Sequence, residues 1–488
     1  MSLWSLVSLS LCAFGVTAIF DPFAEDRNFF LNTKSEELWR ILQLPRHLGI
    51  ARNVIIFLGD GMGIPVITAS RIYKGQQEGN PGEETYLNFE TFPYSGMIRT
   101  YCVDKQVPDS SCTATALLTG VNAPFGTVGL DSHGRHLDCS NYSELDEDHL
   151  PISIMTHAQN AGKKTGGLWR REAEFPAKKF GIRHSLFFTA FPELSPYRCV
   201  TTKHENHMEF ESEKKKPVSG EPTLAEMTEA AIELLQNPNG FVLLVEGGRI
   251  DHALHCTNAK RAILETLALE KAINIALLST NPVDTLILVG ADHSHVMTIN
   301  GYPKRGNPIL GLAGTQADYK LPYTTLMFAN GHSYNYRQNG THILWRNVSS
   351  ANTNDLNFRQ QAGTFQPEGF ETHGGEDVAF YANGPWSHLI SGSHDLAYVG
   401  HVLLFAACLG DYEDACGVEN NGRSKRTKTM DNNVNTQEFD TYETQLSSKD
   451  NLYLMATGSD DAVPGLSAIV DAVLELDDVV ALWREKRK

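Results

Sequence analysis

The stretch Asn53-Val-Ile-Ile-Phe-Leu-Gly-Asp-Gly-Met-Gly63 decides the fold of this chain. Its apolar run, Val54–Leu58, is continuous rather than alternating, which is typical of a strand buried on both faces of a sheet. Asp60 follows this run, between two glycines. Because α/β sheets bind ligands at the carboxyl ends of parallel strands, Asp60 is the first candidate ligand.

Two further apolar runs of the same kind, Phe241–Val245 and Thr285–Val289, predict two more buried strands. Helical patterns lie between them, at Pro222–Leu235 and Asn258–Leu278. This alternation indicates an α/β fold, a doubly wound, mainly parallel sheet with helices on both faces. The polar stretches at about 330–370 and at Gln437–Leu452 are poor in predicted strands, which indicates loops or a small accessory subdomain.

Charge and composition narrow the class of protein. The 488 residues include 41 Lys and Arg against 58 Asp and Glu, a formal net charge of −17, which excludes a nucleic-acid binder driven by bulk charge. With 41% hydrophobic and 20% charged residues, the chain has the composition of a globular protein. We expect residues 19–488 to form a single domain behind a signal peptide.

The N-terminus predicts export. Residues 1–18 form an apolar stretch that ends in a cleavage pattern of small and β-branched residues, and the charged segment Asp21–Trp39 follows it. The alternative is a buried N-terminal helix, because no basic residue precedes the apolar run. Sequons at Asn141, Asn339 and Asn347 agree with a glycoprotein that is extracellular or at the cell surface.

The cysteines and the C-terminus add to this picture. Of eight cysteines, removal of Cys12 with the signal peptide leaves seven, so at least one is unpaired or intermolecular. Cys408 and Cys416 lie close enough in sequence to form a local disulfide. Acidic residues interrupt the helical pattern of Leu466–Trp483, which predicts a soluble helix and gives no support to membrane anchoring.

Acidic and imidazole side chains follow each of the three predicted strands. A single Asp in such a place is usually a helix cap, but three such endings at one sheet edge indicate a ligand site. Asp251 and His255 are four residues apart and would share one face of a helix, as two zinc ligands do. The donors suffice for more than one divalent cation: Asp60, Glu246, Asp251, His255, Asp292, His293 and His373.

The segment Val107–Ala116 predicts a loop that enters a helix, since small residues follow Asp109 and Ser110. One interpretation is an ordinary helix cap. The other is a nucleophile: Ser110 would lie at a positive helix N-terminus, where an anion is favoured and where a metal ion would lower the pKa of the hydroxyl.

With these residues in place, the chain resembles the alkaline phosphatases from about Leu38 to Gly417, with one interrupted stretch. The matching runs are long: NVIIFLGDGMG from Asn53, Val107–Ala116, GFVLLVEGGRIDH from Gly240, ADHSHV from Ala291 and ETHGGEDVA from Glu371. The resemblance implies two Zn²⁺ and one Mg²⁺ per chain, phosphate monoesters as substrates and a homodimer, in which Phe23–Leu44 would embrace the partner or cap its own subunit.

The resemblance also implies a role for each candidate residue. Ser110 would be the nucleophile that becomes a phosphoserine. One zinc would be held by Asp251, His255 and His373, and the other by Asp60, Asp292, His293 and Ser110. Asp60 and Glu246 would bind the magnesium. His252 and His295 flank these ligand positions in the sequence, so we expect them to be outer partners of the metal ligands. His252 could equally be a structural residue.

The resemblance stops after Gly166 and resumes near His207, which makes 167–206 an aberrant segment. In the family this region carries a Ser or Thr of the magnesium site, an Arg that clamps the substrate phosphate and a partner for Cys139, and none of them is matched here. Trp169–Lys203 is instead basic, with seven Lys or Arg against three Glu. We interpret it as an altered or misassembled exon or a grafted loop; a substitute guanidinium is the other reading.

Three functions compete. The first is a metal-dependent phosphomonoester hydrolase that acts through a phosphoserine and is impaired by loss of the clamping Arg. The second is a secreted, non-catalytic homologue that keeps its metals for folding and binds a partner. A phosphodiesterase or sulfatase-like enzyme is the third, and the sequence context of Ser110 disfavours it.

Overall fold

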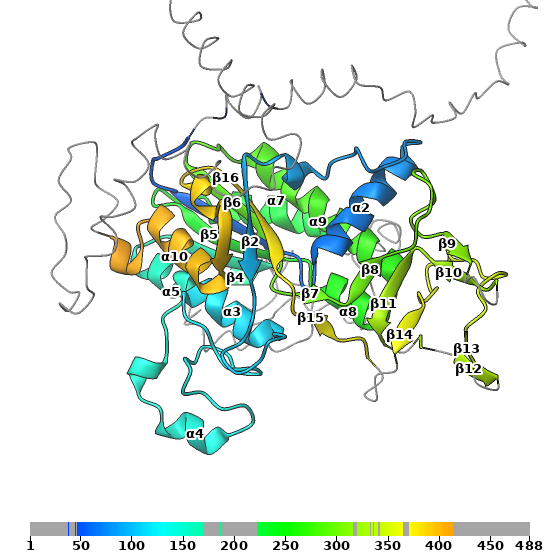
Figure 1. Ribbon diagram of the computed structural model, residues 1–488. Helices are drawn as coiled ribbons and strands as arrows, with labels where there is room; N and C mark the ends of the chain where they lie inside the picture. Colours follow the sequence, from blue (N-terminus) through cyan, green and yellow to red (C-terminus); the bar gives the residue numbers. More distant parts are fainter. Residues whose placement is uncertain are drawn as a thin grey trace, which may run out of the picture. The chain divides into compact units, whose positions relative to one another are not determined.

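Figure 1 shows the computed structural model of the chain. It describes residues 46–168 and 222–413 except for 316–319, 332, 335, 340–341 and 365–369, together with 38, 44 and 186–187. The predicted signal peptide, the C-terminal helix, the polar stretch 437–452, Cys416 and nearly all of segment 167–206 lie outside the described residues. Those predictions are therefore not tested by the structure.

The centre of the molecule is an eight-stranded sheet of order β17-β2-β16-β6-β1-β5-β3-β4. Of these described strands, β16 alone runs antiparallel to its neighbours, so the sheet is mainly parallel as predicted. The strands are β1 (Asn53–Leu58), β2 (Tyr94–Arg99), β3 (Lys164–Leu168), β4 (Leu186–Phe187), β5 (Phe241–Glu246), β6 (Thr285–Gly290), β16 (Val378–Asn383) and β17 (Gly392–Asp395).

Helices cover both faces of this sheet. On one face α3, α5 and α10 contact one another, and on the other α2, α7 and α8 each contact α9 (Figure 1). The α-helices are α2 (Ile64–Gln77), α3 (Ser110–Thr119), α4 (Cys139–Glu144), α5 (Ile154–Asn160), α7 (Leu224–Leu235), α8 (Arg249–His255), α9 (Ala259–Ser279) and α10 (Leu396–Ala406). Short 3₁₀ helices are η2 (Asn88–Thr91), η3 (Glu147–His149), η4 (Ser387–Ile390) and η5 (Gly410–Tyr412).

The three apolar runs form the central strands β6, β1 and β5, and the predicted strands are confirmed to within one residue at each end. Their side chains are almost completely buried, and the side chain of Phe57 has no exposed surface. Burying a side chain of this size contributes roughly 1.5–3 kcal/mol, so the continuous apolar pattern stabilises the middle of the sheet. The helix α7 begins at a capping box, in which Thr223 Oγ1 accepts from the Glu226 amide at 3.2 Å.

The accessory part of the chain consists of small sheets, on the right in Figure 1. One has the order β14-β11-β8, two more are the pairs β9-β10 and β12-β13, and a separate pair is β7-β15. Their bounds are β7 (Ser294–His295), β8 (Met297–Ile299), β9 (Leu312–Thr315), β10 (Pro322–Thr324), β11 (Leu326–Asn330), β12 (Tyr336–Asn339), β13 (His342–Trp345), β14 (Ala362–Thr364) and β15 (His373–Gly374). The expectation that 330–370 is poor in strands was wrong, because a hairpin such as β12-β13 forms by backbone pairing without a long apolar run.

In the part of the chain that the structure describes, no helix is both long enough and apolar enough to cross a membrane.

Candidate functional site

The site forms where β1, β5 and β6 end. Leu58 pairs with Glu246 on one side and with Gly290 on the other, so the residues that follow all three strands emerge at one edge of the sheet. Gly61 then adopts φ of +71°, a left-handed conformation that favours glycine. Its amide donates to Asp292 Oδ1 at 3.0 Å, which ties the β1 turn to the β6 turn.

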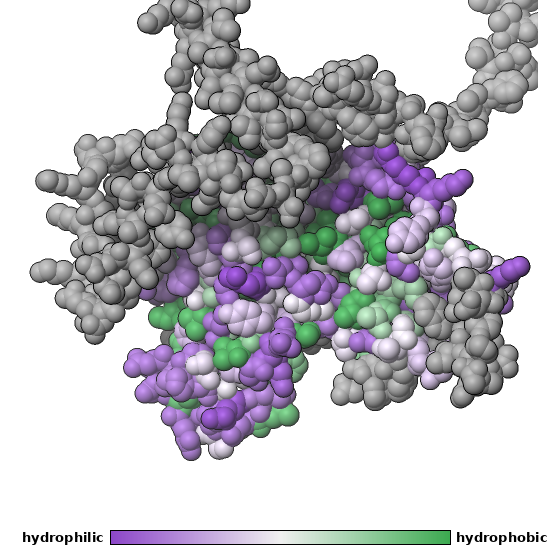
Figure 2. All heavy atoms as spheres, in the orientation of Figure 1, coloured by the Kyte–Doolittle hydropathy of each residue, from purple (hydrophilic) through white to green (hydrophobic). Residues whose placement is uncertain are grey.

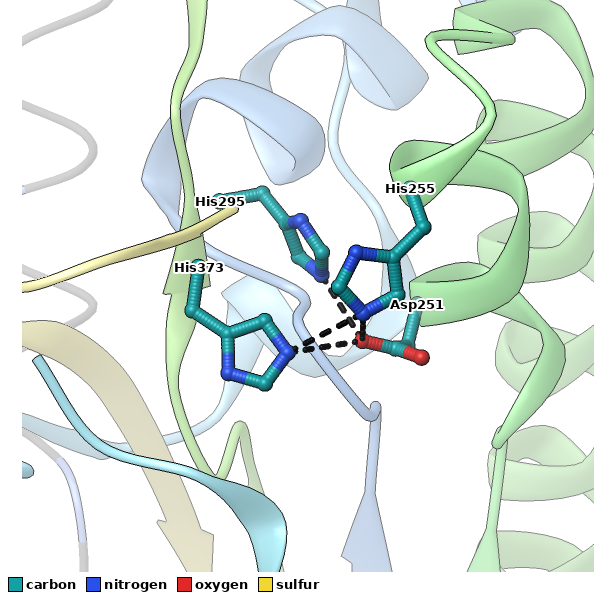
Figure 3. Close-up of side chains that lie close together, drawn as sticks. All are labelled: Asp251, His255, His295 and His373. Carbon is teal, nitrogen blue, oxygen red and sulfur yellow. Dashed lines mark hydrogen bonds and ion pairs between the residues drawn. The ribbon is translucent and has the colours of Figure 1, made fainter. Parts of the chain in front are cut away.

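A first group of side chains consists of Asp251, His255, His295 and His373, from α8, β7 and β15 (Figure 3). Asp251 Oδ1 lies 3.2 Å from His255 Nε2, 2.9 Å from His295 Nε2 and 3.3 Å from His373 Nε2. The Nε2 atoms of His255 and His373 are 3.2 Å apart. Burial alone would raise the pKa of Asp251, but hydrogen bonds from the three imidazoles outweigh it and hold that pKa well below its usual value.

The donor atoms of this group fit one metal ion. His255 Nδ1 donates to the Glu371 carbonyl at 2.5 Å, and His373 Nδ1 donates to the Pro108 carbonyl at 2.9 Å. Each ring therefore turns Nε2 toward the other ring and toward the Asp251 carboxylate, an arrangement that a cation, either a proton or a metal ion, stabilises. Ligands of a tetrahedral zinc at about 2.0–2.1 Å lie about 3.3 Å apart, and these three atoms are spaced at 3.2–3.3 Å.

His295 belongs to the same group but is held differently. Both of its ring nitrogens face carboxylates, Nε2 that of Asp251 and Nδ1 that of Glu371. Burial would lower the pKa of His295, yet Glu371 and Asp251 raise it to about 10, so the ring is protonated and lacks a free lone pair. Its place agrees with the outer role suggested by the sequence. Glu371 also accepts from the Val296 amide at 2.9 Å, and sequence reasoning missed it, although it stands two residues before His373.

A second group joins Asp60, Asp292 and His293, all almost completely buried. His293 Nε2 lies 3.4 Å from Asp60 Oδ1 and 3.4 Å from Asp292 Oδ2. His293 Nδ1 donates to the Ser294 carbonyl at 3.2 Å, and burial lowers the pKa of the ring well below its usual value. The lone pair of a neutral imidazole thus faces two carboxylates, and the spacing again fits ligands of one ion.

Ser110 lies beside this second group. Its Oγ is 3.1 Å from His293 Nε2 and 3.5 Å from Asp60 Oδ1. The predicted loop and helix are confirmed: α3 begins at Ser110, and Asp109 Oδ1 caps the helix by accepting from the Cys112 amide at 3.3 Å. The hydroxyl therefore lies at the positive end of a ten-residue helix.

The two groups are neighbours. The rings of His293 and His373 stack with centroids 3.6 Å apart, so one ring of each group touches the other group. The structure thus brings together seven of the eight candidate residues. Glu246 lies next to Leu58 but belongs to neither group. His252 Nδ1 accepts from Arg249 Nη1 at 2.8 Å, which favours the structural interpretation of His252.

A disulfide between Cys102 and Cys112 encloses the Asp109-Ser110 segment, and the sequence did not predict this pairing. Asp109 Oδ1 also accepts from the Gly126 amide at 3.1 Å. The bond and these contacts fix the loop that presents Ser110. Cys408 is also disulfide-bonded, but its predicted partner Cys416 lies outside the described residues.

Replacing Cys102 and Cys112 together by Ser is expected to lower the free energy of unfolding by about 2–3 kcal/mol, because the bond closes a short loop in the unfolded chain. Urea unfolding of both proteins measures the difference. Cys256→Ser is the matched control, since Cys256 is a free thiol. An unchanged midpoint in the double variant would show that the bond does not stabilise the fold.

Comparison with known proteins agrees with this geometry. The family model described as Alkaline phosphatase matches residues 51–170 and 203–409. The chain belongs to the alkaline phosphatase family. It is thus a member of a family of phosphoric monoester hydrolases. The alkaline phosphatase match omits residues 171–202, which lie inside the segment 167–206 that departs from the family in sequence.

Curated alkaline phosphatases align over most of the chain. The human tissue-nonspecific isozyme is 33% identical over 478 residues, covering 79% of this chain and 89% of its own length. The isozyme of Felis catus is 32% identical over 484 residues, covering 80% and 90%. Among solved structures, Thermus thermophilus alkaline phosphatase has 19% identity and a TM-score of 0.48, covering 75% of this chain and 93% of its own. The enzyme of the Antarctic bacterium TAB5 has 17% identity and a TM-score of 0.47, covering 75% and 100%.

Proposed function

We propose that this chain is a metal-dependent phosphomonoester hydrolase that acts through a phosphoserine at Ser110. The proposal rests on one observation: two groups of carboxylate and imidazole side chains converge beside one serine hydroxyl at a helix N-terminus. We assign Asp251, His255 and His373 to one Zn²⁺, and Asp60, Asp292, His293 and Ser110 to another. The Mg²⁺, with Asp60 and Glu246 as ligands, stays a prediction from the resemblance.

Bound metal ions would supply Lewis acidity for the phosphoryl oxygens and lower the pKa of the serine hydroxyl. Ser110 Oγ gives up its proton to solvent and attacks phosphorus, an Oγ–P bond forms, the bond from phosphorus to the ester oxygen breaks, and the leaving alkoxide takes up a proton and departs as the alcohol. Water then attacks the phosphoserine from the vacated side, which frees Ser110 and releases inorganic phosphate with retained stereochemistry. Asp109 and the disulfide fix the loop that presents Ser110, and the amides at the start of α3 favour the phosphate anion.

Metal removal tests this function. We expect the purified chain to hydrolyse p-nitrophenyl phosphate, to lose this activity on chelation with EDTA and to regain it when Zn²⁺ is returned. Metal analysis before chelation should find at least two zinc ions per chain, because two donor groups are present. Activity that survives complete removal of zinc would contradict the proposal.

The second candidate is a non-catalytic homologue that keeps its metals and binds a partner. It is favoured by the departure from the family at 167–206, where the clamping Arg is expected. This segment lies almost wholly outside the described residues, so loss of the clamp stays a prediction. A chain that binds both zinc ions but shows no phosphoserine and no turnover would establish this alternative.

We also propose that the chain is secreted or lies at the cell surface. The Cys102–Cys112 disulfide supports an oxidising compartment, and the sequon residue Asn347 is exposed. A homodimer is the proposed assembly, and its test is the mass of the purified protein in solution.

A further inference from the structure

A third group of metal-type ligands lies away from the strand ends, in the loop between α3 and α5. It consists of Asp131, His133 and His149, whose ligand atoms all lie within 4.8 Å of one another. This loop carries α4 at the lower left of Figure 1, and its surface is predominantly hydrophilic in Figure 2. The three residues share no member with the two groups at Ser110.

The Asp131 carboxylate is the centre of this group. Its Oδ1 lies 3.1 Å from His133 Nδ1, and its Oδ2 lies 2.9 Å from His149 Nδ1. The two imidazole rings lie with centroids 4.1 Å apart. One carboxylate and two imidazoles thus converge, and further coordination positions are left for water.

Two contacts prepare the group for a cation. The Asp131 amide donates to the His149 carbonyl at 3.2 Å, so the two ends of the loop segment 131–149 are already held together. His149 Nε2 lies 3.8 Å from Asp146 Oδ1, which places a second carboxylate on the ring nitrogen that faces away from Asp131. A carboxylate in that position orients a metal-binding imidazole and raises its basicity.

We propose that Asp131, His133 and His149 form an additional site for a divalent transition-metal ion of the Zn²⁺ type, which cross-links the two ends of the loop segment 131–149. The donor set is a mixed nitrogen and oxygen set, which suits Zn²⁺ better than Mg²⁺ or Ca²⁺. This site is independent of the proposed function, because none of its residues contacts Ser110 or the two groups beside it in the described contacts.

A proton competes with the metal at this site. The hydrogen bond to Asp131 raises the pKa of His149, so without metal the pair exists as an ion pair over a wider pH range. Both side chains of the pair are partly exposed, and a metal ion must displace this proton to bind the ring nitrogen, so its binding weakens as the pH falls.

The test compares the full-length chain with His133→Asn, using Zn²⁺ alone as the probe. His133 is 59% exposed in its side chain, so the substitution leaves the fold intact. His136→Asn is the matched control, because His136 is an exposed histidine of the same loop outside the group. After dialysis against buffered Zn²⁺, the native chain and His136→Asn should each hold one zinc ion more than His133→Asn, with a loss of affinity of at least about tenfold at this site.

Two further readouts make the result decisive. Turnover of p-nitrophenyl phosphate should be the same in all three proteins, which separates this site from the zinc ions at Ser110. Zn²⁺ should slow proteolysis within 131–149 in the native chain and not in His133→Asn. Equal zinc content and equal protection by Zn²⁺ in the native chain and His133→Asn would overturn the proposal, whether or not the chain proves to be a phosphatase.

Discussion

Ser110→Ala is expected to abolish the phosphoenzyme that is trapped at acid pH and to lower turnover by roughly 10³-fold or more. The substitution removes the oxygen that forms the bond to phosphorus. In the proposed mechanism the neighbouring His293 forms no covalent bond to phosphorus, so it does not replace the serine. Rapid acid quenching with ³²P-labelled substrate, followed by peptide mapping, measures the trapped species, and steady-state kinetics measures turnover.

The neighbouring serine supplies the control. Ser111 follows Ser110 in the first turn of α3, and its carbonyl accepts from Thr115 Oγ1 at 3.0 Å, so the helix is retained in Ser111→Ala. This variant should trap phosphate as the native chain does. If Ser110→Ala still accumulates labelled protein, another residue is the nucleophile and the assignment of Ser110 is wrong.

Asp251→Asn should remove one zinc ion per chain and lower phosphatase activity by at least about 10²-fold. Asp251 Oδ1 is the atom on which His255, His295 and His373 converge, and the amide carries no charge to balance a cation. Without the carboxylate, the protonated ring of His295 also loses one of its two counter-charges. Atomic absorption of the dialysed variant measures the zinc content.

Glu371→Gln is the companion variant, because Glu371 is not one of the proposed zinc ligands but contacts His255 and His295 beside them. It bonds to His295 Nδ1, and its carbonyl accepts from His255 Nδ1, so we treat it as a positioning residue. It should weaken zinc binding by about 10- to 100-fold, and saturating Zn²⁺ should restore most of the turnover. Full zinc content in Asp251→Asn would refute the ligand assignment, and a Glu371→Gln variant that Zn²⁺ cannot rescue would place Glu371 in direct contact with the reaction.

The order of the strands explains why these residues meet. Because β6, β1 and β5 are adjacent and parallel, the turns after β1 and β6 emerge side by side, and Asp60 lies within reach of Asp292 and His293. The pairing of β15 with β7 aligns His373 with His295, and this register closes the first group around Asp251. The packing of distant segments therefore selects which donors share a site.

The sequence alone determined the features that depend on local pattern. Continuous apolar runs predicted the three central strands, since a strand buried on both faces must be apolar throughout. Small residues after Asp109 and Ser110 predicted a helix that starts near Ser110, and α3 begins there. Residue types after the strands predicted a metal site, because carboxylates and neutral imidazoles are the donors that zinc takes.

Only the tertiary structure decided the contacts between segments that are far apart in sequence. It gave His295 two carboxylate partners, paired Cys102 with Cys112 and brought His149 to Asp131. A sequence pattern reports the local backbone and which face is buried. Distances between side chains from different segments follow instead from the packing of the whole chain, which no short stretch encodes.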